Sequence, residues 1–493
     1  MKELTIIIFT ILLLSFSSNA QWVQIGGDID GEAAQDRSGS SVSMSSDGLT
    51  VAIGALSNGG NGANAGHVRV YRNISGVWTQ IGSDIDGESE GDRSGTSVSV
   101  SADGTRVAIS SPHHAGVNGT LSGQVRVYEE QDGDWNQVGS AMEGEAAMDE
   151  FGTEVSLNDD GTIVAIGAEG NDTDGNGFGH VRVFEVLGGE WIQMGSDIDG
   201  NSLSGPFGAS LCLSGNGQVL AVGTRENNIV NGHVRVFQFD GDWIQVGSDI
   251  MGLSPGDLTG VSVRMSNDGT TLAMGAPLAN GILPSSGVVR VFENTADEWT
   301  QVGSDISGAV GNERVGGFGG VSLSDDGATV VVAAKSFGNN RGKVRVFQNM
   351  NGEWIQQGED ILGESQGDQS GFSVDLSGDG NSLAIGAIFN AGSAPNAGHV
   401  RVYQMGTTGL SEIKLAQASV YPNPSDGEIR IDLNVLVENV TMHVFTIQGV
   451  HVHSENLGSI RSFTYSLPET SGLYFLQLVA QGGEVKTLKV VKE

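Results

Sequence analysis

The chain has 493 residues, a formal net charge of −35, 76 glycines and only 9 prolines. Its length exceeds that of one ordinary compact domain, and abundant glycine without proline is typical of many short strands joined by tight turns, not of collagen. The strong negative charge disfavours nucleic acid and anionic membrane surfaces as partners. The single cysteine, Cys212, cannot form an intrachain disulfide, and its apolar neighbours predict a small core residue.

Residues 1–20 have the features of an export signal. Lys2 gives a short charged start, residues 4–16 are mostly apolar, and Ser18-Asn19-Ala20 ends the segment with small residues. This order is typical of a signal peptide, and the apolar stretch is short for a membrane span. We expect cleavage before Gln21 and a mature protein without membrane insertion.

A short pattern, Trp-x-Gln-x-Gly, then recurs seven times along the chain, roughly every 55 residues. A fixed period of this size indicates a repeat architecture in which each unit packs on the next. Because the pattern is present in every unit, we expect its side chains to pack and form hydrogen bonds within the repeat region rather than to contact a binding partner. The seven tryptophans are Trp22, Trp78, Trp135, Trp191, Trp243, Trp299 and Trp354.

Each unit contains four predicted strands. In the first unit, residues 41–45 and 51–55 flank an Asp47-Gly48 turn, which is a strong hairpin signal. Residues 67–71 form the third strand and residues 78–82 the fourth, and an acidic loop leads to the next unit.

The phase of the repeat predicts a closed ring. The array begins with a fourth strand at Trp22 and ends with a third strand at 399–403, so the last unit lacks a strand that the N-terminus can supply. An open solenoid would gain nothing from this offset, whereas in a ring the two ends complete one blade. We therefore predict an all-β fold in which residues 21–405 form a seven-bladed β-propeller.

Several units share short glycine-containing motifs: Phe151-Gly152 with 166–168, Phe207-Gly208 with Val222-Gly223, and Gly275-Ala276-Pro277. In these residues the units resemble the FG-GAP repeats of integrin-α-like propellers. Many members of that family carry a calcium loop between the first and second strands. A tight Asp-Gly turn takes that place here, so the regular calcium sites of the family are expected to be absent.

An arginine stands at the centre of every third strand. A buried arginine requires a partner, so we predict a ring of Arg–carboxylate pairs within or between blades, and keep anion binding as the alternative. The arginines are Arg69, Arg126, Arg182, Arg235, Arg290, Arg345 and Arg401. The candidate partners are the Asp after each fourth strand (Asp28, Asp84, Asp197, Asp249, Asp305, Asp360) or the Asp before each first strand (Asp36, Asp92, Asp149, Asp257, Asp368).

The period stops near Gly406. Residues 406–416 are predicted to be a linker, and residues 417–493 alternate apolar and polar positions in short strands, which predicts a small Ig-like β-sandwich. The predicted strands include 440–447 and 450–455.

A set of residues in fixed order marks this C-terminal segment: Pro422, Asn423, Pro424, Gly427, Gly449, Gly472, Tyr474, Lys489 and Lys492. With these residues the segment resembles the C-terminal sorting domain of type IX secretion substrates from Bacteroidetes. The resemblance implies export across the inner membrane by the N-terminal signal, outer-membrane translocation by the type IX machinery, and then release or surface attachment. An ordinary adhesive sandwich domain is the alternative.

Catalytic motifs give little support for an enzyme. The hydrolase-like pattern Gly-x-Ser-x-Gly occurs at 87–91, 252–256 and 363–367, always directly after a fourth strand, and is interpreted as part of a repeated loop. The pair His113-His114 is isolated, and the other histidines of the array are interpreted as repeat residues.

One segment fits the start of a calcium loop. Asp172, Asp174 and Asn176 alternate along a glycine-rich turn, and their side-chain oxygens could converge on one ion. Val183 stands where a bidentate Glu would complete the loop, so a plain acidic turn remains the alternative.

Ligand binding is expected on the variable loops between the second and third strands, because such loops carry function on a rigid frame. We predict a secreted or cell-surface interaction module, monomeric, that binds an extracellular protein or glycan and is not an enzyme. The alternatives are a structural surface-layer component and a polysaccharide-active enzyme. The loops are 56–65, 111–122, 169–178, 224–231, 277–286, 335–341 and 388–397.

Overall fold

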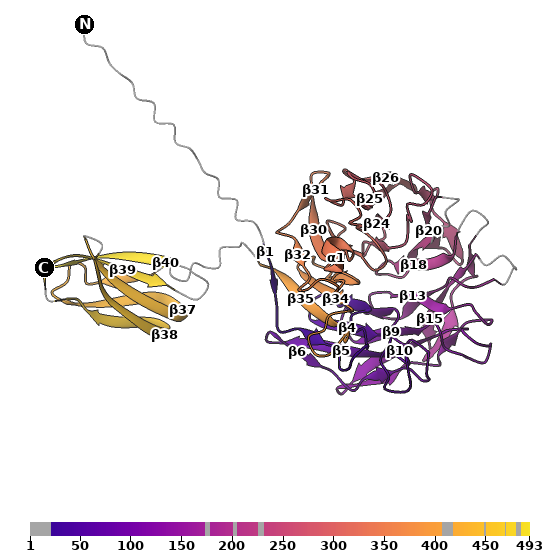
Figure 1. Ribbon diagram of the computed structural model, residues 1–493, viewed down its shortest axis with the longest axis horizontal. Helices are drawn as coiled ribbons and strands as arrows, with labels where there is room; N and C mark the ends of the chain where they lie inside the picture. Colours follow the sequence, from indigo (N-terminus) through magenta and orange to yellow (C-terminus); the bar gives the residue numbers. More distant parts are fainter. Residues whose placement is uncertain are drawn as a thin grey trace, which may run out of the picture. The chain divides into compact units, whose positions relative to one another are not determined.

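The computed structural model describes residues 21–172, 178–200, 205–224, 231–406, 418–447, 450–468, 470–479 and 485–493. The predicted signal segment and almost all of the predicted linker lie outside these ranges. The described residues form two compact units, which divide between Met405 and Gly406. Both units consist of strands, which confirms the all-β prediction (Figure 1). A four-residue turn, α1 (Phe337–Asn340), is the one helix in the described ranges, where no helix has the length and apolar character needed to cross a membrane.

The larger unit is built from five-stranded sheets, which we number I to VII. Sheet I contains β3 (Ser41–Met44), β4 (Thr50–Ala55), β5 (His67–Ile74), β6 (Val77–Gln80) and β7 (Ile85–Asp86). Sheet II contains β8 (Val98–Val100), β9 (Arg106–Ser111), β10 (Gln124–Gln131), β11 (Asp134–Gln137) and β12 (Met142–Glu143). Sheet III contains β13 (Phe151–Leu157), β14 (Ile163–Ala168), β15 (His180–Leu187), β16 (Glu190–Gln193) and β17 (Ile198–Asp199). Sheet IV contains β18 (Phe207–Leu213), β19 (Val219–Thr224), β20 (His233–Phe239), β21 (Trp243–Gln245) and β22 (Ile250–Met251).

The remaining sheets follow the same plan. Sheet V contains β23 (Val263–Met265), β24 (Thr271–Ala276), β25 (Val288–Thr295), β26 (Glu298–Gln301) and β27 (Ile306–Ser307). Sheet VI contains β28 (Val321–Leu323), β29 (Thr329–Ala334), β30 (Lys343–Met350), β31 (Glu353–Gln356) and β32 (Ile361–Leu362). Sheet VII contains β33 (Val374–Leu376), β34 (Ser382–Ala387) and β35 (His399–Gly406) together with β1 (Gln21–Gln24) and β2 (Ile29–Asp30).

The fifth strand of each sheet was not predicted. It has two residues and pairs with the start of the third strand, as β7 does with His67 and Val68 of β5. Its apolar residue is buried, for example Ile85 at 6% exposure. Two residues are too few to show a strand periodicity, so the sequence presented this segment as a loop.

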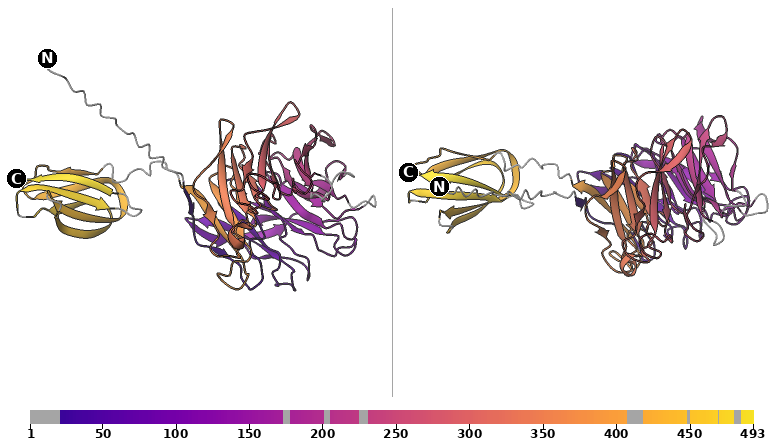
Figure 2. Two further views of the ribbon diagram at one scale, coloured as in Figure 1. Left: turned by 45° about the horizontal axis from the view of Figure 1, so that its top comes forward. Right: turned by 90° about the horizontal axis from the view of Figure 1, so that it is seen from above.

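The two ends of the larger unit meet in sheet VII. β1 pairs with β35, as the phase of the repeat predicted, and Ile25 donates its backbone N–H to Val402. The first strands of successive sheets contact one another, and β33 of sheet VII contacts β3 of sheet I. The sheets therefore surround a common axis, and the chain returns to its starting point (Figure 1, Figure 2).

A ring of backbone hydrogen bonds encircles this axis at the ends of the first strands. Each N–H donates to the carbonyl oxygen of the equivalent residue in the next sheet, over 2.7 to 3.0 Å, and the last bond returns to the first residue. Closure of the ring thus pairs backbone N–H and carbonyl groups that an open array would leave without a partner at its two edges. The donors, in order, are Ser46, Ala102, Asp159, Gly215, Asn267, Asp325 and Gly378.

The Trp-x-Gln-x-Gly pattern joins each sheet to the one before it. Gly26 has a φ of +73°, and a Cβ atom there would lie 2.8 Å from the Cδ1 atom of Trp78 in the next sheet. Gln24 donates a 2.7 Å hydrogen bond to Asp28, which orders the loop after the strand. Five of the seven indoles donate to a carbonyl oxygen of the preceding sheet: Trp78, Trp135, Trp191, Trp243 and Trp354.

The arginine column also joins neighbouring sheets. Arg126 is buried, and its Nη2 donates a 2.8 Å hydrogen bond to the carbonyl oxygen of Asp86 in the preceding sheet, while Nη1 lies 3.7 Å from Glu88. Arg290 instead binds Asp305 with two hydrogen bonds. Equivalent carbonyl bonds are made by Arg69, Arg182, Arg235, Arg345 and Arg401.

These contacts correct the predicted carboxylate partners. An Asp after the fourth strand is the partner of Arg235 and Arg290, but elsewhere a glutamate from the preceding loop approaches the guanidinium. These glutamates come from the loop that leads from one sheet to the next, whereas the aspartates after the fourth strands belong to the same sheet as the arginine. The pairs are Arg69–Glu32, Arg126–Glu88, Arg182–Glu145, Arg345–Glu313 and Arg401–Glu364, at 3.4 to 3.9 Å.

The smaller unit contains β36 (Ser419–Tyr421), β37 (Glu428–Thr446), β38 (His451–Ser466), β39 (Gly472–Val479) and β40 (Val485–Lys492). Its strands are longer than predicted. β37 includes most of the predicted strand 440–447 but begins at Glu428. Its pairing with β38 shifts register between Asp432 and Val437, which lets one strand bend without ending.

Residues of the sorting motif tie the edges of this unit together. Asn423 accepts a 2.9 Å hydrogen bond from the N–H of Val491 and donates a 2.8 Å bond to the carbonyl of Lys489, so it holds β40 in place. Tyr474 is buried, and its hydroxyl donates to the carbonyl of Thr470. Lys492 donates to the carbonyl of Pro468. Gly449 lies outside the described residues.

Candidate functional site

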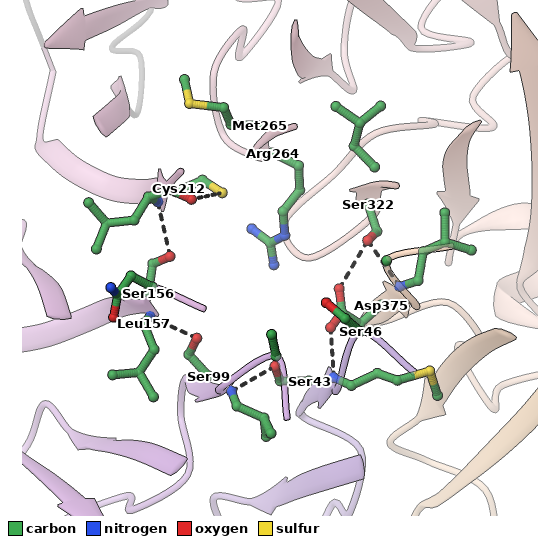
Figure 3. A pocket seen from close by; sticks show the side chains of 18 of the residues that line it. Ser43, Ser46, Ser99, Ser156, Leu157, Cys212, Arg264, Met265, Ser322 and Asp375 are labelled. Atoms are coloured by element: carbon green, nitrogen blue, oxygen red, sulfur yellow. Dashed lines mark hydrogen bonds between the residues drawn. The ribbon is translucent and has the colours of Figure 1, made fainter. Parts of the chain in front are cut away.

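The second-to-last residues of the seven first strands form a ring around the axis. In four sheets it is a serine, whose hydroxyl accepts the backbone N–H of the next first strand; Ser99 accepts that of Leu157 at 2.9 Å, for example. A small hydroxyl at this position satisfies a backbone donor that faces the channel. The seven residues of this ring, which we call the axial ring, are Ser43, Ser99, Ser156, Cys212, Arg264, Ser322 and Asp375 (Figure 3).

Asp375 fits the axial ring although it is charged. Its Oδ2 accepts the N–H of Met44 at 2.8 Å, as a serine would, and its Oδ1 accepts the hydroxyl of Ser322 at 3.0 Å. Burial raises the pKa of this carboxyl, and the nearby Arg264 opposes the rise.

Arg264 breaks the pattern of the ring. A guanidinium has no acceptor, so it cannot receive the N–H of the next strand. Its side chain extends toward the middle of the pocket, whereas the serines point to neighbouring strands (Figure 3). Nη1 donates to the carbonyl of Val263 at 2.9 Å and lies 3.7 Å from Glu154. Burial lowers the pKa of Arg264, but the charges of Glu154, Cys212 and Asp375 outweigh this and raise it.

Glu154 is a second departure from the repeat, two residues before Ser156 of the axial ring. The equivalent residue is a serine in five sheets and Gly320 in sheet VI. The Glu154 and Arg264 side chains are each 24% exposed, so both contact the channel and both are largely desolvated. Burial raises the pKa of Glu154, and Arg264 and a hydrogen bond with Ser97 counteract the rise.

Two cavities meet at these side chains. One, of about 300 Å³, lies toward the strand ends from which the loops between second and third strands leave, and Phe318 and Phe372 line it. The other, of about 150 Å³, extends toward the Asp-Gly turns and is lined by the axial ring. Arg264 and Glu154 line both cavities, so the pair lies where the larger, loop-side cavity meets the smaller one.

The sequence-predicted sites lie elsewhere. Asp172 is exposed on a loop, and Asp174 and Asn176 lie outside the described residues, so the calcium loop remains a prediction. The variable loops contribute only Leu56 and Glu169 to the larger cavity among the residues described.

Three further sequence predictions concern a cysteine, a histidine and a serine. Cys212 packs against a hydrophobic core cluster, as predicted, and it also belongs to the axial ring, where burial raises the pKa of its thiol. His114 lies 3.1 Å from Asp92, and the backbone N–H of Ser89, in the first hydrolase-like pattern, donates to the same Asp92.

Sequence reasoning missed Arg264 and Glu154, although a signal was present. When the first strands are placed in register, the axial ring is a column of serines with three exceptions, and Glu154 is an exception in the adjacent column. A departure from a repeated residue at one position marks an asymmetric site more directly than the composition of the loops does.

Comparisons with solved structures identify propeller-like neighbours. A hydrazine synthase of Kuenenia stuttgartiensis has a TM-score of 0.50 and 12% identity, covering 78% of this chain and 97% of that one. A periplasmic gluconolactonase of Pseudomonas aeruginosa has a TM-score of 0.46 and 18% identity, covering 66% and 87%. A proposed 6-phosphogluconolactonase of Bacteroides uniformis has a TM-score of 0.49 and 12% identity, covering 87% and 99%.

These neighbours correct one prediction. The chain was expected not to be an enzyme, and that expectation is contradicted because a fold of this kind occurs in the hydrazine synthase. At such low identity the likeness shows the fold alone. Comparison of the sequence with curated proteins finds no match.

The C-terminal unit has a clear relative. Residues 419–493 match the family model described as the secretion system C-terminal sorting domain. The match covers the motif residues from Pro422 to Lys492 and leaves the repeat region outside it. The protein is accordingly secreted by the type IX system to the cell surface or the extracellular space.

Proposed function

We propose that the repeat region is a seven-bladed β-propeller that binds a neutral sugar unit, such as the end of a glycan, at the loop side of its axial channel. The exported protein would then act as a monomeric glycan-binding or adhesive module. Residues 1–20 would serve as the signal peptide, and residues 417–493 as an Ig-like sandwich that engages the type IX machinery. The resemblance of the repeats to FG-GAP units belongs to the same proposal.

The observation that carries the proposal is the pair Arg264 and Glu154. Both replace residues that the repeat otherwise keeps small, and both contact the cavities rather than only each other. A guanidinium offers several N–H donors and a carboxylate offers acceptors, so together they can bind vicinal hydroxyl groups.

The surroundings fit a neutral sugar. Serine hydroxyls line the cavities, and Phe318, 37% exposed, offers an apolar surface at the larger one. A cavity of about 300 Å³ accommodates a ligand of monosaccharide size. The chain charge of −35 and the carboxylate of Glu154 disfavour an anionic ligand.

Calorimetric titration of the full-length protein with neutral monosaccharides and oligosaccharides, chosen from a glycan array, tests the proposal. The variant Glu154→Ser/Arg264→Ser restores the residues found in the other sheets, so it should fold and should bind at least tenfold more weakly. The control Arg93→Ser removes an exposed arginine and should bind as the natural protein does.

Two results would overturn the proposal: no binding to any neutral sugar, or unchanged binding by the double variant. Chromatography of the sugar after incubation shows whether it leaves the protein intact, which separates a binding protein from an enzyme acting at the same place.

A further inference from the structure

Three junctions between sheets bring a histidine and two carboxylates together. The ligand-type atoms of each group lie within 4.8 Å of one another in the described part of the chain. In each group the histidine begins a third strand, the aspartate follows the fourth strand of the same sheet, and the glutamate comes from the loop of the preceding sheet. The groups are Glu32/His67/Asp84, Glu145/His180/Asp197 and Glu364/His399/Asp28, which we call the junction clusters.

The histidines form the buried base of the junction clusters. His67, His180 and His399 have side chains only 1 to 2% exposed. Neither ring nitrogen of His399 has a hydrogen-bond partner, although Nδ1 points into the cluster at 3.5 Å from Oδ2 of Asp28. A buried imidazole nitrogen without a partner costs free energy that a ligand at this place would recover.

The carboxylates form the rim. The aspartates are 29 to 35% exposed, and the glutamates are 43 to 47% exposed. An ion from solvent can therefore reach the buried nitrogen past the two acidic side chains.

At two other junctions the nitrogen of a lysine or glutamine side chain lies between two carboxylates, at the strand position that the histidine has in the junction clusters. Lys343 stands where the histidine stands elsewhere, and its Nζ lies 2.6 Å from Glu313 and 3.5 Å from Asp360. Gln124 takes the same position in sheet II, and its Nε2 lies 3.3 Å from Glu88 and 3.4 Å from Glu143. A positive or N–H-donating group thus fills the space between carboxylates wherever the histidine is replaced by Lys or Gln.

Each junction cluster offers ligand atoms of two kinds. A neutral imidazole has a lone pair for coordination, and carboxylate oxygens can bind the same ion. The arginine two residues after the histidine approaches one oxygen of the glutamate, as Arg69 does at 3.5 Å from Oε1 of Glu32, and the second oxygen can bind an ion.

From this geometry we propose that each junction cluster binds a divalent transition metal of the zinc class through one imidazole nitrogen and two carboxylate oxygens. Water completes a tetrahedral shell. Ligand atoms about 2.1 Å from such an ion lie roughly 3.4 Å apart. The Nδ1–Oδ2 distances between histidine and aspartate are 3.5, 4.0 and 3.5 Å, so these atoms would move only slightly when an ion binds. The metals would link neighbouring sheets at the three junctions.

The test uses the full-length protein after treatment with a chelator. Titration with Zn²⁺ should show three sites per chain, and Co²⁺ should give the visible absorption of tetrahedral coordination. The variant His67→Gln/His180→Gln/His399→Gln places at each cluster the residue that sheet II has naturally. It should lose the three sites and the cobalt spectrum, and the rise in Tm on adding zinc should disappear.

Two further variants make the outcome decisive. Asp28→Asn/Asp84→Asn/Asp197→Asn keeps the shape of each cluster and should weaken zinc at least tenfold, so it replaces the first variant if that one does not fold. The control His443→Gln/His451→Gln/His453→Gln removes histidines of the sorting domain and should leave all three sites intact. Absence of zinc binding, or zinc binding lost only in the control, would overturn the proposal.

Discussion

The indole Nε1 of Trp78 donates a 3.0 Å hydrogen bond to the carbonyl oxygen of Ile25 at the end of β1 in the preceding sheet. The two residues are 53 positions apart in the chain, yet the same contact recurs at four other junctions. We therefore expect Trp78→Phe to lower the free energy of unfolding by about 1 kcal/mol, since a phenyl ring keeps most of the packing and loses the bond. Chemical denaturation followed by tryptophan fluorescence and circular dichroism measures the change.

A neighbouring glycine supplies the control for that contact. Gly26→Ala should destabilise the protein by more than 1 kcal/mol, because a side chain at a φ of +73° is strained and would press on the indole of Trp78. Gly27→Ala, where added atoms would meet nothing within 4 Å, should have little effect. Equal effects of the two substitutions would argue against the packing role of the Trp-x-Gln-x-Gly pattern.

Loss of an arginine from the centre of a third strand should lower the free energy of unfolding more than loss of the tryptophan hydrogen bond does. Arg290 is 5% exposed and binds both oxygens of Asp305, so Arg290→Met should lower the free energy of unfolding by about 2–3 kcal/mol, through the unpaired carboxylate it leaves behind. Asp305 is partly exposed, which keeps the loss at the lower end of the range for buried pairs. The exposed Arg93, changed to Met, should cost less than 0.5 kcal/mol on the same scale. A similar decrease in the free energy of unfolding in both variants would contradict the stabilising role of the Arg290–Asp305 pair.

Asp375 predicts a pH dependence of stability. Burial raises the pKa of this carboxyl in the folded protein above its unfolded value. Folding therefore favours the protonated form, and the stabilisation is present below the unfolded pKa of about 3.9 and is lost as the pH rises through the folded pKa. Within that window one proton corresponds to a slope of about 1.4 kcal/mol per pH unit.

The variant Asp375→Asn tests this dependence. The amide keeps an oxygen that can accept the N–H of Met44 and has no charge to bury. Its Tm should exceed that of the natural protein at pH 7, and the difference should vanish below the unfolded pKa. Thermal unfolding between pH 3.5 and pH 8 measures it, and a constant difference across that range would contradict the stated cause.

Asn423 predicts a defect in secretion. Its side chain makes two hydrogen bonds to β40, so Asn423→Ala should destabilise the sorting domain by about 2 kcal/mol and reduce the amount of protein that reaches the medium or the cell surface. Immunoblots of cell and medium fractions measure the distribution. Thr487→Ala, at an exposed position of the same strand, should be exported normally, and a matching defect there would point to a cause other than these bonds.

The sequence by itself determined the repeat architecture and the way in which the two ends of the repeat region pair. Seven recurrences of a tryptophan pattern, an Asp-Gly or Asn-Gly hairpin in each unit and an offset between the chain ends were sufficient to predict four of the five strands of each sheet and the pairing of β1 with β35. These features are local or periodic, and the periods of strands and turns are visible in one dimension. The sorting domain was likewise recognisable from residues in a fixed order.

Only the tertiary structure decided what those residues contact. The guanidinium of Arg69 pairs with Glu32 of the preceding loop and not with a predicted aspartate. The distance between these two side chains depends on how two neighbouring sheets pack. Arg264 and Glu154, 110 positions apart, lie 3.7 Å from each other only because the sheets close around an axis. A contact between units that are far apart in the chain carries no periodicity, so the candidate site became visible when the first strands were seen side by side.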